Sequence, residues 1–244
     1  MEHAPETTES AERFARPEIA ELATPLAFIL DRLQTRIEGG VYGAIIGDDS
    51  SGRIPALIMD RVLRERYRTL GHPVLETRFA AGSGSGYTQI EGQQYDDKVD
   101  ALRRLVAGLG GGRRVLIVTD VVVSGKSLEP LMVALTLEGV PFDVAATGYA
   151  EEWGKGTAEM LRERFGAELI AGGTQIFPPI LNRPDLSGVK KQKPETHARP
   201  AKDEIKGFLF REGKRKKFQR NLNEVRDDIA AVADVLLERY LAGF

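Results

Sequence analysis

The sequence predicts an α/β fold in three layers, with a mostly parallel sheet that carries helices on both faces. Two observations support this class. Short apolar runs alternate with longer segments whose apolar residues recur at helical spacing. The short runs are apolar along their whole length, as expected for strands that are buried on both faces of a parallel sheet.

The N-terminal part of the chain supplies the first helices and the first strand. Residues 1–16 are polar and are expected to be disordered. Apolar residues at helical spacing predict a helix over 17–38, which a pair of glycines ends. The run VYGAIIG over 41–47 predicts a buried strand, and a helix is expected to follow over 54–70.

The rest of the chain continues the alternation and then changes character. Further helices are expected over 95–109, 128–138 and 157–165, and further strands over 74–79, 115–120, 142–149, 168–171 and 174–177. We therefore treat 17–186 as one α/β domain. Beyond it, 187–222 is rich in Lys and Pro and is expected to be a basic linker, and 223–244 is expected to form a C-terminal amphipathic helix.

Composition excludes several kinds of site. The 244-residue chain has no cysteine, which excludes disulfides, thiolate metal sites and a cysteine nucleophile. Its three histidines, His3, His72 and His197, lack metal-ligand spacing. No apolar run approaches the roughly 20 residues that span a bilayer, and the N-terminus lacks the pattern of a secretory signal. We therefore expect no membrane association and a cytoplasmic location.

The formal net charge of −2 hides an uneven distribution. Residues 188–226 are strongly basic, so the remainder of the chain is acidic. This indicates either a contact between tail and body or an anionic partner. The run over 211–220 resembles nucleic-acid-contacting segments in composition, but Phe218 is its only aromatic residue. We favour a solvated linker or a strap across the acidic body.

Two polar loops follow expected strands, GDDSSGR over 47–53 and TDVVVSGKS over 119–127. Ligands of parallel sheets bind at the carboxyl ends of the strands, so both loops are candidate binding loops. In the second loop a buried strand delivers Asp120 and the chain then turns through small residues into a helix. Backbone amides converge at such a turn, and the helix N-terminus adds positive potential.

The side chains of the second loop suit a phosphate that is attached to a sugar. Ser124 and Ser127 supply hydroxyl donors, and Lys126 adds positive charge. Asp120 is placed to accept hydrogen bonds from sugar hydroxyls. The alternative is an ordinary strand–turn–helix connection in which Asp120 is a cap.

The segment over 115–127 resembles the signature of the type I phosphoribosyltransferases. Four apolar residues come first, Asp120 matches the second of two acids, and an apolar pair follows. The phosphate-binding end of the signature is matched by three residues, Ser124, Gly125 and Ser127. Two positions depart from it: Thr119 stands where the family has its first acid, and Val123 where the family prefers Thr or Ser.

The resemblance implies a site that binds phosphoribosyl pyrophosphate and transfers the phosphoribosyl group to a nucleobase-like acceptor with release of pyrophosphate. In the family the acids hold the ribose hydroxyls, the loop holds the 5-phosphate, and Mg²⁺ accompanies the pyrophosphate. Asp120 would be the catalytic residue, and the substrate would be bound by Thr119, Val123, Ser124, Gly125, Lys126 and Ser127. Because Thr119 can hydrogen-bond but cannot offset positive charge, we expect a weak or altered activity.

The first loop lies where the resembled family has its pyrophosphate loop. Ser51, Gly52 and Arg53 suit an oxygen-rich anion. Asp48 and Asp49 would repel pyrophosphate unless Mg²⁺ bridges the charges, which makes this pair a candidate metal site. Two alternatives stay open: the pair binds a hydroxyl-rich or cationic group, or it caps the helix that follows.

Residues 80–92 are rich in Gly and Ser and lie where the resembled family has a flexible lid. Tyr87, Thr88 and Gln89 could reach into the site from such a lid. The alternative is a surface connection without a role in binding.

Three functions follow from these observations. The first is a phosphoribosyltransferase. The second is a non-catalytic regulatory protein that binds phosphoribosyl pyrophosphate or a ribose phosphate, which Thr119 and Asp48-Asp49 favour. The third is a P-loop nucleotidase, because Gly125-Lys126-Ser127 precedes a helix, but that motif requires glycine at the position of Asp120. The oligomeric state is open, and a homodimer is compatible with this fold class.

Overall fold

The computed structural model describes residues 14–49, 51–81, 92–149, 156–173, 184–190, 199–200 and 212–242. Their α-helices are α1 (Pro17–Ala20), α2 (Ala23–Glu38), α3 (Arg53–Leu70), α4 (Gln93–Val106), α5 (Glu129–Leu137), α6 (Thr157–Phe165), α7 (Pro184–Ser187) and α9 (Glu212–Ala242). A short 3-10 helix, η2 (Leu109–Gly112), precedes β3. The strands are β1 (Tyr42–Asp48), β2 (Glu76–Ala80), β3 (Arg114–Val122), β4 (Phe142–Tyr149), β5 (Leu169–Ala171), β6 (Val189–Lys190) and β7 (Arg199–Pro200).

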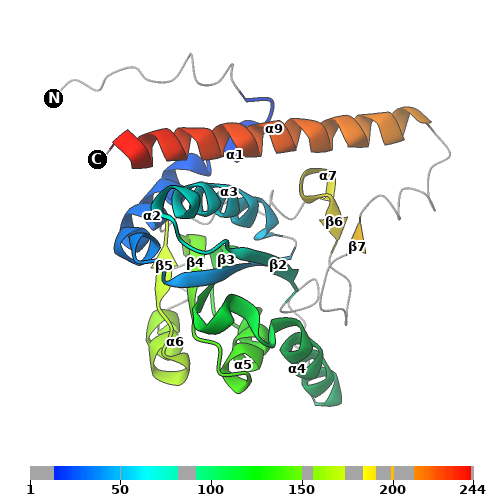
Figure 1. The fold of residues 1–244 in the computed structure, drawn as a ribbon. Coiled ribbons are helices and arrows are strands. Elements are labelled where there is room, and N and C mark those ends of the chain that lie inside the picture. The colour runs from blue at the N-terminus through cyan, green and yellow to red at the C-terminus, as the bar shows by residue number, and fades with distance from the viewer. Residues whose placement is uncertain are drawn as a thin grey trace.

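Strands β1 to β5 form one parallel sheet in the order β2-β1-β3-β4-β5. In Figure 1, α2 and α3 cover one face of this sheet, and α4, α5 and α6 cover the other. The predicted α/β class, with a parallel sheet between helices, is confirmed. Helix α9 lies outside α2 and α3 and adds a further layer on that side (Figure 1). Strands β6 and β7 form a separate antiparallel pair.

The central strands β1, β3 and β4 are mostly apolar because both faces of the sheet are buried there. Ile45 and Leu116 pack with residues of α2, α3 and α9, whereas their neighbours Ile46 and Ile117 pack with residues of α4, α5 and α6. All four side chains are fully buried. Burial of one such side chain contributes roughly 1.5–3 kcal/mol, so the two cores together drive folding of the described chain.

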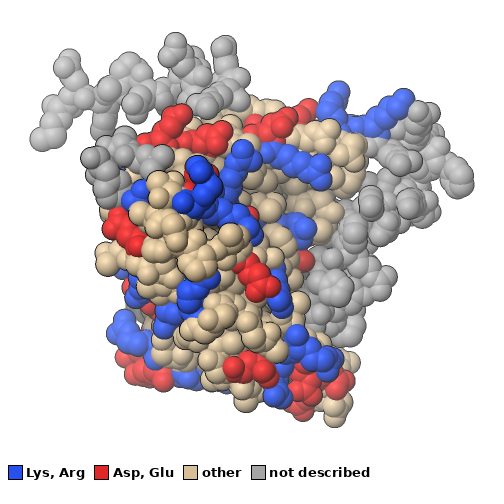
Figure 2. Space-filling view, viewed as in Figure 1, with Lys and Arg blue, Asp and Glu red and all other residues tan. Residues whose placement is uncertain are grey.

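Helix α9 begins earlier than the sequence predicted. It starts at Glu212, so the basic run that we expected in a linker lies in its first turns. Lys and Arg are good helix formers, so their abundance alone does not mark a linker. Figure 2 shows Lys and Arg side chains gathered at this end of α9, with Asp and Glu further along the helix.

The N-terminal elements also differ from expectation. The single helix expected over 17–38 is divided by a turn at 21–22 into α1 and α2. The amides of Ala15 and Arg16, at the end of the segment expected to be disordered, donate to the Asp228 carboxylate of α9 at 3.1 and 2.7 Å. Residues 1–13 and the expected strand over 174–177 lie outside the described residues.

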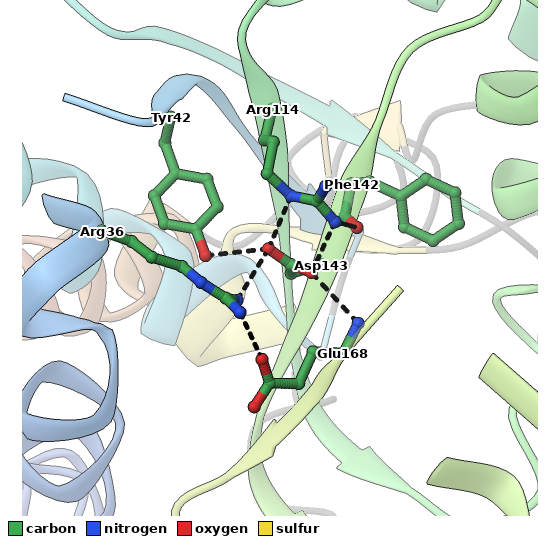
Figure 3. Close-up of polar contacts among 6 residues, drawn as sticks. All are labelled: Arg36, Tyr42, Arg114, Phe142, Asp143 and Glu168. Carbon is green, nitrogen blue, oxygen red and sulfur yellow. Dashed lines mark hydrogen bonds and ion pairs between the residues drawn. The ribbon is translucent and has the colours of Figure 1, made fainter. Parts of the chain in front are cut away.

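A buried carboxylate links several elements at the edge of the sheet where the parallel strands begin (Figure 3). Asp143, near the start of β4, accepts hydrogen bonds from Arg36 and from the Tyr42 hydroxyl at 3.0 Å each, and from Arg114 at 2.8 and 2.9 Å. Arg36 also pairs with Glu168 at 2.5 Å. Because a buried carboxylate is costly without partners, the network fixes α2, β1, β3 and β4 to one another. It lies at the edge of the sheet away from the two polar loops.

Candidate functional site

The two polar loops lie side by side at the carboxyl edge of the sheet, because β1 and β3 are parallel neighbours. Gly47 of β1 is paired with Val118 of β3, which brings the next residues, Asp48 and Thr119, beside each other. The loops also meet at Gly52. A Cβ atom on Gly52 would lie 2.4 Å from the Val118 carbonyl oxygen and 2.8 Å from Thr119 Cα, so only glycine permits this approach.

The Thr119 hydroxyl lies between two carboxylates. It is buried, 3.3 Å from Oδ1 of Asp120 and 3.4 Å from Oδ2 of Asp48. Asp48 is only 3% exposed, whereas Asp120 is half-buried. Thr147 of β4 donates its hydroxyl to the carbonyl oxygen of Asp120 at 2.7 Å and thereby fixes the backbone there. Of the two carboxylates, Asp120 is the one that a ligand can reach.

Residues 123–127 leave the sheet and form a turn between β3 and α5. Gly125 has a φ of 71°, in the left-handed region that glycine adopts without strain. The Leu128 amide donates to the Gly125 carbonyl at 3.0 Å, and the Thr157 hydroxyl donates to the Val123 carbonyl at 3.1 Å. These contacts hold the turn through its carbonyl groups. The exposed Val123 side chain offers no donor.

The amide groups of this turn make no hydrogen bond to the described part of the protein. Among the described residues, none accepts a hydrogen bond from the backbone amides of 124–127. The side chains of Ser124, Lys126 and Ser127 are exposed. The N-terminus of α5 adds positive potential, although an acid in its first turn, Glu129, reduces it. Such a set of donors suits an oxygen-rich anion.

The loop after β1 offers fewer accessible groups. Asp49 is buried and pairs with Nη1 of Arg53 at 2.8 Å. The Arg53 guanidinium also lies over the Phe79 ring, with Cζ 4.2 Å from the ring centroid. Ser51 and Gly52 are buried. Of the three residues expected to bind an anion here, Arg53, with 27% of its side chain exposed, is the accessible one.

The structure excludes one role that was left open for the two carboxylates of this loop, the capping of α3. The N-cap residue of α3 is Gly52, so Asp48 and Asp49 do not occupy the capping position. Within the described parts of the chain, no three or more His, Asp or Glu side chains are grouped to hold a metal ion. The described residues thus hold no preformed cluster of ligands, and an Mg²⁺ ion at Asp48 and Asp49 stays a prediction. An Mg²⁺ ion would have to arrive with a phosphorylated substrate that supplies ligands of its own.

Three supporting residues were not identified from the sequence. Thr147 is a polar residue in the mostly apolar strand β4, and its position there could have indicated a specific contact. Thr157 and Phe79 contact the loops only because α6 and β2 lie beside them in the fold, and nothing in their local sequence indicates it. The expected lid residues, Tyr87, Thr88 and Gln89, lie outside the described part of the chain.

No protein-family model matches the chain, and no curated protein matches it. Membership of the phosphoribosyltransferase family therefore stays a prediction that rests on the residues of the second loop. Among the helices that the structure describes, none is both long enough and apolar enough to cross a membrane.

Proposed function

We propose that the chain binds phosphoribosyl pyrophosphate at the carboxyl ends of β1 and β3 and transfers its phosphoribosyl group to a nucleobase-like acceptor. The observation that carries this proposal is the turn after β3. Its amides have no acceptor among the described residues, and it begins three residues after a reachable carboxylate, Asp120.

The turn suits the 5-phosphate of the ligand. A phosphate dianion accepts several hydrogen bonds at once, and the amides of 124–127 together with Ser124, Lys126 and Ser127 offer donors of that kind. Asp120 as a carboxylate only accepts hydrogen bonds, so it suits the ribose hydroxyls and not the phosphate. A ribose 5-phosphate requires hydrogen-bond donors for its phosphate and, beside them, a hydrogen-bond acceptor for its hydroxyl groups.

In the transfer, a bond forms between a nitrogen of the acceptor and C1 of the ribose. The bond between C1 and the pyrophosphate oxygen breaks, and pyrophosphate leaves with its electron pair, while the acceptor nitrogen loses its proton to water. The ribose ring carries positive charge in the transition state, and the Asp120 carboxylate is placed to stabilise it. Groups that act in this way contribute roughly 3–4 kcal/mol each.

A second candidate function is binding without transfer, as in a regulatory protein. Two observations favour it. Thr119 adds no negative charge to β3, and Arg53, the accessible cation of the other loop, is already paired with Asp49 at 2.8 Å. Pyrophosphate release, measured with Mg²⁺ and a panel of nucleobases, separates the two functions. Binding of phosphoribosyl pyrophosphate without release for any base would support the regulatory function.

Titration calorimetry with ribose 5-phosphate and Asp120→Asn tests the binding step. Hydrogen bonds to a charged acceptor contribute roughly 1.5–3 kcal/mol, so the variant is expected to bind about tenfold more weakly or worse. Asp100→Asn is the matched control, because the Asp100 side chain on α4 is 62% exposed and pairs with Arg103 of the same helix at 3.4 Å. Equal affinities of wild type and Asp120→Asn would place the site elsewhere.

A further inference from the structure

We propose that Asp48 is a second carboxylate of the ribose site, a positioning residue that acts on Asp120 through Thr119. The inference rests on the proposed function and assigns a role to a residue that does not belong to the signature segment. Its basis is the contact across the sheet: Oδ2 of Asp48 lies 3.4 Å from the Thr119 hydroxyl, which lies 3.3 Å from Oδ1 of Asp120.

Asp48 is fixed in this place by its surroundings. Its carbonyl oxygen accepts a hydrogen bond from the Gly52 amide at 2.7 Å, and the next amide, that of Asp49, donates to Ala80 of β2 at 3.0 Å. The residue is 3% exposed. Gly52 also packs directly against Thr119, so the backbone of the loop that carries Asp48 lies close to β3.

The position of Asp48 gives a physical reason for Thr119. A hydroxyl donates one hydrogen, so Thr119 can bond to one of the two carboxylates at a time. When ribose hydroxyls donate to Asp120, the Thr119 hydrogen can turn to Asp48. An acid at position 119 would instead add a third carboxylate next to two others, and like charges at such distances repel strongly.

Two negative charges therefore lie on the ribose side of the site, one from each strand. The carboxylates are acceptors and attract hydroxyl donors or a ring that develops positive charge, whereas the donors of 124–127 attract the phosphate. Removal of the Asp48 charge should weaken binding of the sugar and leave binding of the phosphate intact. This difference separates a role in the site from a role in the fold.

The test uses Asp48→Asn, Thr119→Asp and the double variant that carries both changes, in the full chain. Asp48→Asn is expected to bind ribose 5-phosphate about tenfold more weakly, with inorganic phosphate bound as well as or better than by wild type. Thr119→Asp is expected to melt at a lower temperature because of the added repulsion. The double variant moves the carboxylate from β1 to β3 and should recover ribose 5-phosphate affinity to within about threefold of wild type.

The outcomes distinguish the inference from the function on which it rests. Wild-type affinity of Asp48→Asn for ribose 5-phosphate would overturn the role of Asp48 alone. A double variant that binds as weakly as Asp48→Asn would also overturn it, because a purely structural defect is not repaired by a carboxylate on the neighbouring strand. If wild type binds neither ribose 5-phosphate nor phosphoribosyl pyrophosphate with Mg²⁺, the proposed function fails, and the inference fails with it.

Discussion

Gly125 determines the shape of the turn that follows β3. Its φ is 71°, a value that glycine adopts without strain. A Cβ atom there would lie 3.3 Å from Met160 Cε and 3.4 Å from Thr157 Cγ2 of α6. A side chain at this position would thus meet backbone strain and close neighbours together. Any shift of the turn would redirect the amides of 124–127, which are the main donors of the candidate phosphate site.

Gly125→Val is expected to lower the affinity for inorganic phosphate more than about tenfold, because the turn can no longer present its amides together. The left-handed conformation alone should cost about 1–2 kcal/mol of unfolding free energy. Gly139→Val is the matched control: its φ is 65°, and a Cβ atom there has no neighbour within 4 Å. This control should show a similar loss of stability with unchanged affinity in calorimetry. Equal phosphate affinities of the two variants would contradict the proposed turn.

At the residue scale, the sequence predicted what lies within one continuous segment. The order of strand, Asp120, small residues and helix was readable because these parts are consecutive, although β3 continues to Val122, two residues beyond the expected end of the strand. The contact between Asp48 and Thr119 was not predicted, because it depends on the register of β1 against β3. A single sequence does not encode that register in any short pattern.

Helix α9 is the element whose role was least apparent in advance. Its amphipathic character was predicted from six apolar residues at helical spacing. Of these, Val235 is half-buried and the others are buried, namely Val225, Ile229, Val232, Leu236 and Tyr240. Its partners were not predicted, because amphipathic spacing indicates that one face of a helix is buried but does not identify the helices against which it packs. In the structure this face joins the core formed by α2, α3 and the sheet. The Asp228 carboxylate, which binds the amides of residues 15 and 16, ties the start of the described chain to the same helix.

Leu236→Ala is expected to lower the free energy of unfolding by about 2–4 kcal/mol, because it removes a buried side chain and leaves a cavity between α9 and the helices below it. Leu137→Ala is the control, since Leu137 ends α5 with 58% of its surface exposed. Urea unfolding followed by circular dichroism measures both. A loss of less than about 0.5 kcal/mol for Leu236→Ala, the size of an ordinary surface substitution, would show that α9 is not part of the folded core.

At the scale of the whole molecule, several buried tyrosines make the fold sensitive to alkaline pH. Burial raises the pKa of Tyr42, and the nearby Asp143 charge raises it further. Burial likewise raises the pKa of Tyr240, to about 12, and that of Tyr67. A tyrosine in the unfolded chain has a pKa of about 10, so above that pH the unfolded chain releases protons that the folded chain retains. The stabilisation is therefore complete below about pH 10 and is lost as the pH rises further.

Urea unfolding between pH 8 and pH 12, compared in wild type and Tyr42→Phe, measures this effect. Wild type is expected to lose stability progressively above about pH 10, and the variant to lose less over the same range, because one of the shifted groups is gone. At pH 8 the variant should be less stable by about 1.5–3 kcal/mol, the contribution of a hydrogen bond to a charged acceptor, here from the Tyr42 hydroxyl to Asp143. Parallel curves for the two proteins would exclude Tyr42 as a source of the pH dependence.

The class of fold was predictable because it depends on a pattern that repeats along the whole chain. Five strands, most of them apolar, with helices between them leave few arrangements other than a parallel sheet that is covered on both faces. The extra layer on the outer side of α2 and α3 was not predictable in this way. It comes from a segment far along the sequence, and the alternation of strands and helices ends before that segment begins.

The position of α9 also has a consequence for synthesis of the chain. Helices α2 and α3 leave the ribosome early, whereas the helix that covers their outer side is translated last among the described elements. At about 5–20 residues per second, the interval is on the order of ten seconds. During this time an apolar surface of the growing polypeptide is open to chaperones and to neighbouring nascent chains. The core between the sheet and α9 therefore cannot be completed until α9 has left the ribosome.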